Sequence, residues 1–192
     1  MARSFSEQEK EKIRERLLTA CRQNWTQHGY KKTGIDELCR QAGISKGAFY
    51  LFFESKEALF CEVLCRVQEQ IYREASQILA KRQDRYGAAE ALKYIYREYD
   101  ENHFLYDADT GDYQTLKNRL SEEQAGRLEE WNRLNQRLFL EQPRLKLKVK
   151  EELAVSAIYS LIMTIRNKDV LLCGHLEVFD FMADGLAAQL YE

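Results

Sequence analysis

Helix-breaking residues are scarce in this sequence. One proline and nine glycines stand among 192 residues, which is too few for the many tight turns of an all-β protein. The other positions are rich in Leu, Ala, Glu, Arg, Lys and Gln, which are good helix formers. Apolar residues make up 45% and charged residues 31% of the chain, as in ordinary globular proteins. We therefore expect an all-α fold.

Capping signals and glycines divide the chain into about nine predicted helices. Capping boxes, in which a Ser and a Glu or Gln cap one helix start reciprocally, stand at Ser6–Glu9 and Ser121–Gln124. Single N-cap candidates are Thr33, Ser45 and Ser55. Gly29 and Gly43 are expected to end the helices before them. The predicted helices span residues 7–28, 34–42, 46–52, 56–82, 87–102, 109–118, 122–140, 147–168 and 176–190.

Charge is distributed unevenly along the chain. Residues 1–56 hold 11 Lys or Arg and 7 Asp or Glu, a net charge of +4, and residues 57–192 hold 18 and 24, a net charge of −6. A basic segment on an acidic body suits contact with a polyanion, although an accidental asymmetry gives the same numbers. The overall net charge of −2 excludes a wholly basic nucleic-acid binder.

The sequence indicates a cytoplasmic protein without membrane contact. Its first residues lack the apolar segment of a signal peptide. The most apolar stretch, residues 153–165, is shorter than the ~20 residues that a bilayer requires. The five cysteines are an odd number, which argues against a disulfide framework.

Cys61 and Cys65 lie four residues apart on one predicted helix face. A redox pair or the beginning of a metal site would place two thiols in this way. The spacing is close to the upper limit for a disulfide, however, and no further His or Cys lies nearby in the sequence. Packing in an apolar interior is the simpler interpretation, and we predict no metal and no cofactor.

Residues 33–56 have the pattern of a helix-turn-helix, because two short predicted helices flank a tight turn at Gly43. In that motif the second helix enters the DNA major groove. Lys46, at the start of that helix, can reach a phosphate or a guanine edge, and the small residues Gly47 and Ala48 allow a close approach to base edges.

Two hydroxyl residues complete the predicted contacts of this motif. Thr33 and Ser45 offer hydroxyl groups and backbone amides at helix N-termini, which attract phosphate. Lys31 and Lys32 contact the DNA backbone in one interpretation and form a solvated charge pair in the other.

The segment from Leu17 to Leu64 resembles the DNA-binding domain of TetR-family transcriptional regulators, over roughly a quarter of the chain. The matching residues are Trp25, Gly29, Tyr30, Thr33, the run from Ala42 to Gly47, Phe49, Tyr50, Phe53 and the run from Ser55 to Leu59. The resemblance implies a three-helix DNA-binding domain over residues 1–54. It also implies a helical ligand-binding and dimerisation domain over residues 55–192.

The resemblance also implies roles for single residues. Tyr50 is similar to a family tyrosine whose hydroxyl meets a phosphate, and Lys56 to a phosphate-contacting lysine. Phe52 departs from the pattern, because many members carry a Tyr or His there that can hydrogen-bond DNA. Phe52 can only pack on a thymine methyl, so the operator sequence cannot be read by analogy. Cys21 and Cys39 replace the usual alanines, which is consistent with slightly larger core gaps.

The last two predicted helices suit a dimer interface. The penultimate helix is apolar nearly all round, so it must be covered on both sides. Two such helices from each subunit form a four-helix bundle in the family that the chain resembles, and a monomer core is the alternative.

Aromatic residues of the middle helices are candidates for the wall of a ligand site. Tyrosine hydroxyls and a histidine on an apolar wall can orient a small molecule, although plain core packing explains the same pattern. The candidate ligand-binding residues are Tyr96, Tyr99, His103 and Trp131. Asp107, Asp109 and Asp112 either favour a cationic ligand or belong to a solvated loop.

The resemblance, together with these patterns, implies a homodimeric, TetR-like transcriptional regulator. As a repressor it would bind double-stranded, palindromic operator DNA and respond to an unknown small-molecule inducer. The alternative is a ligand-independent architectural or cell-division protein on the same fold, and a large empty pocket in the body would favour the regulator. An enzyme is not expected, because the sequence has no Gly-rich phosphate loop, metal-ligand cluster or nucleophile elbow.

Overall fold

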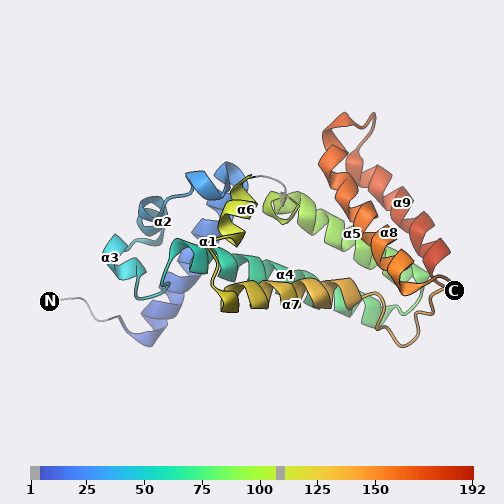
Figure 1. The fold of residues 1–192 in the computed structure, drawn as a ribbon, viewed down its shortest axis with the longest axis horizontal. Helices are drawn as coiled ribbons and strands as arrows, with labels where there is room; N and C mark the ends of the chain where they lie inside the picture. Colours follow the sequence, from blue (N-terminus) through green and yellow to red (C-terminus); the bar gives the residue numbers. More distant parts are fainter. Residues whose placement is uncertain (1–4, 107–110) are drawn as a thin grey trace. The chain divides into compact units, whose positions relative to one another are not determined.

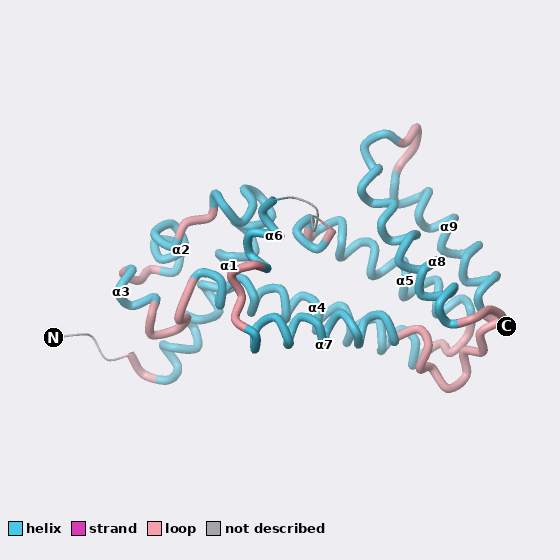
Figure 2. The backbone as a smooth tube through the Cα atoms, viewed as in Figure 1, coloured by secondary structure: helices cyan, strands magenta, loops and turns pink. Residues whose placement is uncertain are grey.

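The computed structural model describes residues 5–106 and 111–192. Within these ranges the chain forms nine α-helices and two short 3-10 helices, which confirms the all-α prediction (Figures 1 and 2). The elements are α1 Glu7–Lys32, α2 Ile35–Ala42, α3 Lys46–Phe49, α4 Lys56–Lys81, α5 Arg85–Glu101, η1 His103–Leu105, α6 Gly111–Lys117, α7 Glu122–Arg137, α8 Glu151–Met163, η2 Thr164–Val170 and α9 His175–Leu190.

Local signals set several helix ends where the sequence predicts them. The Ser6 hydroxyl accepts a hydrogen bond from the Glu9 amide, and the Glu9 carboxylate accepts one from the Ser6 amide. Gly29 interrupts α1 with φ +79°, and Gly43 follows α2 with φ +72°. Both glycines lie in the left-handed region, which other residues adopt only with strain. Ser55 caps α4 by accepting from the Ala58 amide at 3.0 Å.

Several predicted helix boundaries are wrong. The first helix does not end at residue 28 but continues across the interruption at Gly29 to Lys32, and the helix predicted to reach residue 140 ends at Arg137. Thr33 does not cap the second helix, because Gly34 occupies the N-cap position of α2 and Thr33 ends α1. The third helix closes at Phe49, and only tight turns of the backbone continue to Phe52. The fifth helix begins at Arg85, two residues early, because the carboxylate of the residue before it caps the first turn.

The predicted helix over residues 147–168 begins late, at Glu151, and continues as 3-10 helix from Thr164. The segment before it alternates apolar residues and lysines from position 145 to 150, which is the two-residue period of an extended strand. The Lys148 amide donates to the Leu190 carbonyl at 2.8 Å. The segment is therefore held beside the C-terminal residues in an extended conformation.

The described chain divides into two compact units. Unit 1 comprises residues 5–66 and 111–128, and unit 2 comprises residues 67–106 and 129–192. Because the boundaries fall within α4 and α7, both helices contribute side chains to both units. The predicted domains, residues 1–54 for DNA binding and 55–192 for ligand binding and dimerisation, are defined by function. That division stays a prediction.

Unit 1 has an interior of aromatic and aliphatic side chains. Trp25 of α1 packs against Phe60 of α4 with ring centroids 4.6 Å apart, and Tyr30 meets Phe60 edge to face at 5.0 Å. Phe49 of α3 is fully buried and contacts Phe53 at 6.0 Å. The rings around Phe60 thus join α1 to α4, and the burial of Phe49 anchors α3, which packs against α2.

Unit 2 is organised around the pair α5 and α9, which make extensive contact with each other and with α8 (Figure 1). Tyr96 of α5 stacks on Phe179 of α9 at 3.7 Å between ring centroids. Two ion pairs join the same helices, Lys93–Asp184 at 2.7 Å and Arg97–Asp180 at 2.8 Å. A hydrogen bond between His175 Nε2 and Asp100 Oδ2 at 3.1 Å joins them as well.

Over the part of the chain that the structure describes, we find no helix with the length and apolar composition that crossing a bilayer demands.

Candidate nucleic-acid interface and ligand cavity

The short helix α3 presents one face outward and buries the other. Ser45 caps it by accepting from the Ala48 amide at 3.2 Å. Lys46 and Gly47 are exposed, Ala48 is half-buried, and the Tyr50 side chain is 53% exposed beside Leu51 at 71%. Because Phe49 is buried between them, the turn is anchored while these neighbours stay accessible. Five predicted DNA contacts, Ser45, Lys46, Gly47, Ala48 and Tyr50, therefore lie together on one turn.

The ammonium group of Lys46 has an acidic partner in α2. Its Nζ lies 3.1 Å from Asp36 Oδ1, and both side chains are more than half exposed. An exposed pair of this kind contributes little stability. Lys46 can therefore exchange Asp36 for a phosphate at small cost. The sequence reasoning missed Asp36, although its place in the first turn of α2 is visible in the sequence.

The Thr33 hydroxyl is not exposed for the phosphate contact that the sequence predicts. The residue is 1% exposed, and its hydroxyl donates to the Gly29 carbonyl at 2.8 Å. The bond holds the last turn of α1 after the interruption at Gly29. The Thr33 hydroxyl is therefore engaged within the protein. A phosphate contact at this position remains a prediction only for the backbone amides nearby.

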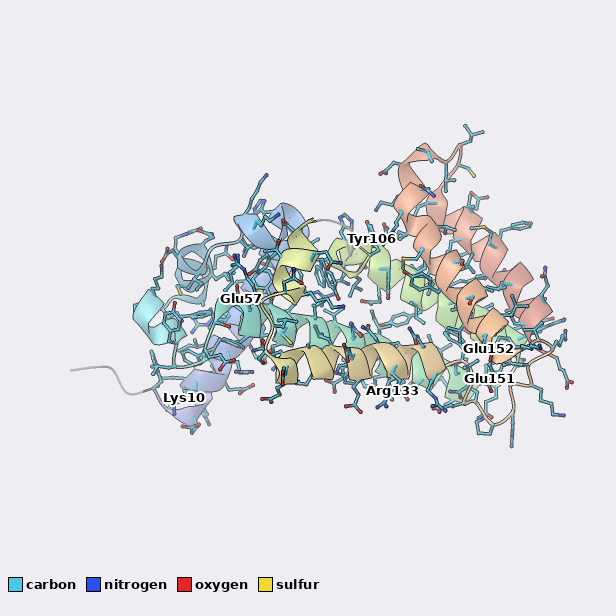
Figure 3. All side chains as sticks on the ribbon, in the orientation of Figure 1. Lys10, Glu57, Tyr106, Arg133, Glu151 and Glu152 are labelled. Carbon is cyan, nitrogen blue, oxygen red and sulfur yellow. The ribbon has the colours of Figure 1, made fainter. Side chains whose placement is uncertain are left out.

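Lys56 is turned inward rather than toward solvent. Its Nζ donates to the Tyr30 carbonyl at 2.6 Å and lies 4.1 Å from the centre of the Tyr30 ring. Burial lowers the pKa of Lys56, and although the Glu57 carboxylate raises it, the pKa stays below its ordinary value. Glu57, labelled in Figure 3, also accepts a hydrogen bond from the Tyr30 hydroxyl. A phosphate contact by Lys56 would require its ammonium to leave this internal site.

Phe52, the departure from the family pattern, has an internal partner too. Its ring lies 6.0 Å from that of Phe5, and its carbonyl accepts from Arg14 at 3.1 Å. The Arg14 guanidinium also covers the ring of Phe53 at 4.4 Å. Arg14 thus ties α1 to the turn that follows α3.

The acidic residues near the middle of the chain do not form a described site. Asp112 pairs with Lys31 at 3.2 Å in unit 1, which gives Lys31 an acidic partner on the protein. Asp107 and Asp109 lie outside the described residues.

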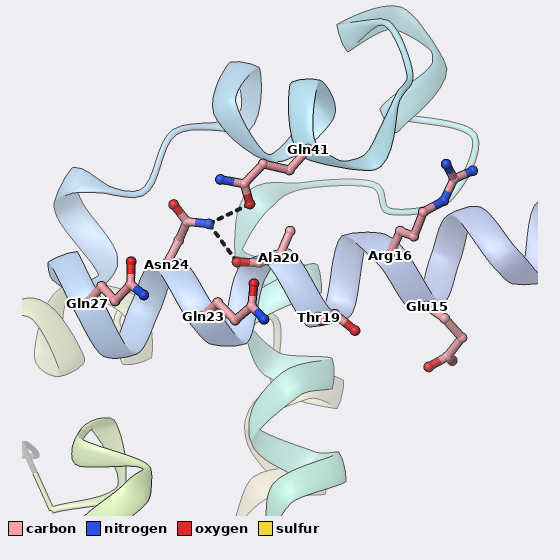
Figure 4. Close-up of a pocket in the computed structure, with 8 residues that line it drawn as sticks. All are labelled: Glu15, Arg16, Thr19, Ala20, Gln23, Asn24, Gln27 and Gln41. Atoms are coloured by element: carbon pink, nitrogen blue, oxygen red, sulfur yellow. Dashed lines mark hydrogen bonds between the residues drawn. The ribbon is translucent and has the colours of Figure 1, made fainter.

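A polar groove runs along α1 on the surface of unit 1 (Figure 4). Its lining is mostly amides and charged groups, including Glu15, Arg16 and Gln27. At its wall the buried amide of Asn24 donates to the Ala20 carbonyl and to Gln41 of α2, both at 2.8 Å. The bond to Gln41 ties α2 to α1 and so helps to position α3, which packs against α2.

Unit 2 contains a cavity of about 390 Å³ between α4, α5, α7 and α8. Buried apolar side chains form part of its lining: Ile71, Ile95, Phe139 and Ile162. Carboxamides line it as well, three from α7 and one from α4: Asn132, Asn135, Gln136 and Gln68. The volume lies in the usual range for a small-molecule site.

One of the four predicted ligand-binding residues lines this cavity. Tyr99 does, whereas Tyr96, His103 and Trp131 are absent from the lining. Tyr96 is held in the stack with Phe179, His103 is exposed, and Trp131 packs edge-on against Tyr72. The carboxamides of α7 were missed. The signal for them was their spacing, because positions 132, 135 and 136 share one helix face.

The two cysteines of α4 are buried, as plain packing predicts. A hydrogen bond with Cys65, together with burial, raises the pKa of the Cys61 thiol. A thiol with a raised pKa is a poor nucleophile and a poor metal ligand. Within the described ranges we find no group of three or more His, Cys, Asp or Glu arranged to hold a metal ion.

Comparison with protein families places the matched segment in unit 1. Residues 17–63 match the model of bacterial regulatory proteins of the tetR family. The uncharacterised helix-turn-helix regulator YhgD of Bacillus subtilis is 33% identical over 63 residues, which are 33% of each chain. The similar regulator YuxN is 41% identical over 56 residues, 29% of this chain and 18% of YuxN. The matches thus span a third or less of these curated relatives.

Solved structures show the same fold over nearly the whole chain. The transcriptional regulator FadR from Bacillus subtilis, in complex with stearoyl-CoA, superposes with a TM-score of 0.68 at 14% identity, covering 91% of this chain and 98% of FadR. The TetR-family regulator PfmR from Thermus thermophilus also gives 0.68, at 20% identity, covering 90% of this chain and 97% of PfmR. At these identities the likeness is one of fold.

Proposed function

Residues 17–63 of this chain belong to the tetR family of bacterial regulatory proteins, and from this premise we propose that the protein is a ligand-responsive transcriptional repressor. In this proposal, two copies bind a palindromic operator, and a small molecule in the cavity of unit 2 releases them. The observation that carries it is the outward presentation of Lys46 and Tyr50 on a turn anchored by buried Phe49. The matched relatives are regulators as well, which supports a role other than catalysis.

The cavity supports the ligand-responsive form of this proposal over an architectural protein. An apolar hollow of about 390 Å³ leaves unfilled contacts that a solid core would not. The helix α4 carries Lys56 in unit 1 and both Gln68 and Ile71 at the cavity. A ligand that favours one position of α4 would therefore act on both units through a single element, provided that it binds the two states differently.

A pair of chains is required to read two half-sites. Both α8 and α9 expose large apolar side chains, among them Leu153, Tyr159 and Phe181 at 81%. Exposed apolar patches of this kind mark protein interfaces. We propose that these helices form the dimer contact, which would place two α3 turns about 34–36 Å apart in successive major grooves.

Selection of bound duplexes from a random library by the full chain tests this function. The expected product is an inverted repeat, and sedimentation of the same preparation is expected to give twice the chain mass. Replacement Lys46→Ala is expected to weaken binding about tenfold or more, and Tyr50→Phe about fivefold by loss of one hydroxyl. Lys81→Ala, an exposed lysine in unit 2, is the matched control.

The dependence of DNA affinity on salt concentration distinguishes binding through phosphate contacts from binding through uncharged contacts. Several phosphate contacts give a steep fall of log affinity with log salt, and Lys46→Ala is expected to make that slope shallower. Selected DNA without a repeat, together with unchanged binding by Lys46→Ala, would remove the basis of the proposal.

A further inference from the structure

The cavity of unit 2 is lined entirely by uncharged residues. Among the described residues around it, none is Asp, Glu, Lys, Arg or His. An ion transferred into such a site leaves its hydration shell and finds no counter-charge, which costs far more than the transfer of a neutral molecule. The lining therefore discriminates against both anionic and cationic ligands.

The lining combines apolar side chains with neutral polar groups. The apolar residues come mainly from α4, α5 and α8, such as Ile71, Ile95 and Ile162, whereas α7 contributes three carboxamides. Polar groups also come from the other helices: Gln68, Tyr99, Ser156 and Tyr159. A ligand that matches this lining has an apolar body and a neutral polar group. The exposed lining residues Asn132 and Gln136 lie on α7 and leave the cavity open along this helix.

The side-chain amide of Asn135 identifies the kind of polar group that the ligand would carry. Its Nδ2 donates to the Trp131 carbonyl at 3.0 Å, which fixes the amide orientation, because Oδ1 could not donate there. The same Nδ2 lies 3.4 Å from Gln68 Oε1, a long and therefore weak contact. Asn135 Oδ1 is buried and accepts no hydrogen bond.

An acceptor sheltered from water without a donor is destabilising. A donor on a bound molecule would relieve this cost if the Asn135 side chain, which only this long contact joins to Gln68, turns Oδ1 toward the cavity on binding. We propose that the cavity binds an uncharged, largely apolar ligand whose hydroxyl or N–H group donates to Asn135. This inference rests on the proposed function and names the ligand class of the same site.

A matched series of ten-carbon probes tests the class by calorimetry on the full chain without DNA. 1-Decanol carries a donor, decyl methyl ether has none, and decanoate and decylammonium are charged. We expect 1-decanol to bind, the ether to bind about fivefold more weakly, and each ion to bind about tenfold more weakly or worse. Failure of 1-decanol to bind, or equal binding by either ion, would overturn the proposal.

Variants of Asn135 test its role separately. Asn135→Leu is expected to erase the preference for 1-decanol over the ether without lowering the temperature of unfolding, because an unsatisfied acceptor is removed. Asn135→Asp is expected to favour decylammonium about tenfold relative to the native chain, since it introduces a buried counter-charge. Gln77→Leu replaces an exposed amide of α4 outside the lining and is expected to change neither. A retained preference in Asn135→Leu would contradict the assignment.

Operator affinity without any probe, measured on the same preparations, keeps the two proposals apart. If native DNA binding is intact while the ions bind as well as 1-decanol, the ligand class is wrong and the regulator stands. If 1-decanol binds as expected while no selected DNA binds, the ligand class stands and the regulator is wrong.

Discussion

The interiors of unit 1 and unit 2 differ in how they are filled. In unit 1, the ring centroids of Trp25 and Tyr30 lie 4.6 and 5.0 Å from that of Phe60, and the hollow on α1 is a polar groove at the surface. Unit 2 holds an apolar cavity of about 390 Å³ beside its packed α5–α9 pair. A close-packed interior resists rearrangement, whereas a cavity leaves space for a guest molecule.

This contrast matches what each unit has to do in the proposed function. Base edges are read only if α3 holds one position, and a filled core provides that. A ligand is sensed only if its binding changes an interior, and the cavity allows this. Substitutions in the two interiors are therefore expected to have different consequences.

The largest expected effect follows from removing the anchor of α3. Phe49→Ala deletes a fully buried ring in unit 1 and is expected to destabilise that unit by about 3–5 kcal/mol. Operator binding is expected to be lost, because the turn that carries Lys46 is no longer held in one position by the buried Phe49 ring. Amide hydrogen exchange measures the effect locally, with faster exchange expected in α1 and α2 and little change in α5 and α9.

Leu51→Ala is the control for this change, since Leu51 lies two residues on and is 71% exposed. Its effect on stability is expected to stay within about 0.5 kcal/mol. Equal acceleration of exchange in both units of Phe49→Ala would mean that the interiors are not independent, and the comparison would fail.

Adding volume sharpens the comparison further. Ala42→Leu inserts three carbons at a position in unit 1 that is 0% exposed and is expected to cost about 1–3 kcal/mol. Val155→Phe adds comparable bulk to the wall of the cavity in unit 2 and is expected to be neutral or stabilising. Urea unfolding of both variants checks this, and a cost for Val155→Phe equal to that for Ala42→Leu would show that the hollow is not available space.

The sequence predicts unit 1 in more detail than unit 2, for a physical reason. Hydroxyl caps such as Ser45 and Ser55 and the left-handed glycine Gly43 act over three or four residues, so their partners are adjacent in the sequence. The outward turn of α3 follows from these local rules. The inward position of Lys56 does not, because its partner Tyr30 is 26 residues away.

The cavity lining could not be assigned from aromatic pattern alone. Tyr96 and Tyr99 lie on one predicted helix face, yet Tyr96 stacks on Phe179 and only Tyr99 reaches the cavity. Which of the two tyrosines reaches the cavity depends on which distant helix packs against each side of α5. The sequence shows that Asn132 and Asn135 share one helix face. It does not show that this face lines a cavity, because the other lining residues come from distant helices.

A smaller effect is expected from pH in unit 2. Asp100 lies 2.5 Å from Lys168 Nζ and 3.1 Å from His175 Nε2. Burial raises the pKa of Asp100, but the hydrogen bonds and charges of Lys168 and His175 lower it more, so its pKa lies below the ordinary value. The stabilisation is therefore complete above the unfolded pKa of about 4 and is lost as pH falls through the folded pKa.

Because these groups are partly exposed, the contribution is expected to be below about 1 kcal/mol. Urea unfolding between about pH 6 and pH 3 should show the native chain losing more stability than Asp100→Asn. Glu101→Gln, an exposed neighbour, should follow the native profile. Identical profiles for Asp100→Asn and the native chain would exclude Asp100 as a source of stability in unit 2.

The smallest expected effect concerns the exposed pair on the DNA-binding face of unit 1. Asp36→Asn removes the partner of Lys46, whose Nζ lies 3.1 Å from Asp36 Oδ1. The freed lysine is expected to raise operator affinity by about fivefold at most, because exposed pairs are worth about 1 kcal/mol or less. Fluorescence anisotropy with the selected duplex at fixed salt measures the change.

Loss of a negative charge near DNA would raise affinity even without Lys46, so the pair must be tested as a cycle. If Asp36 acts by holding Lys46, Asp36→Asn adds little in the Lys46→Ala background, and the two changes are non-additive. An equal gain in both backgrounds would mean general repulsion of phosphate. In that case unit 1 presents a fixed surface with no internal competitor for its lysine, which would make its contrast with the adaptable cavity of unit 2 sharper still.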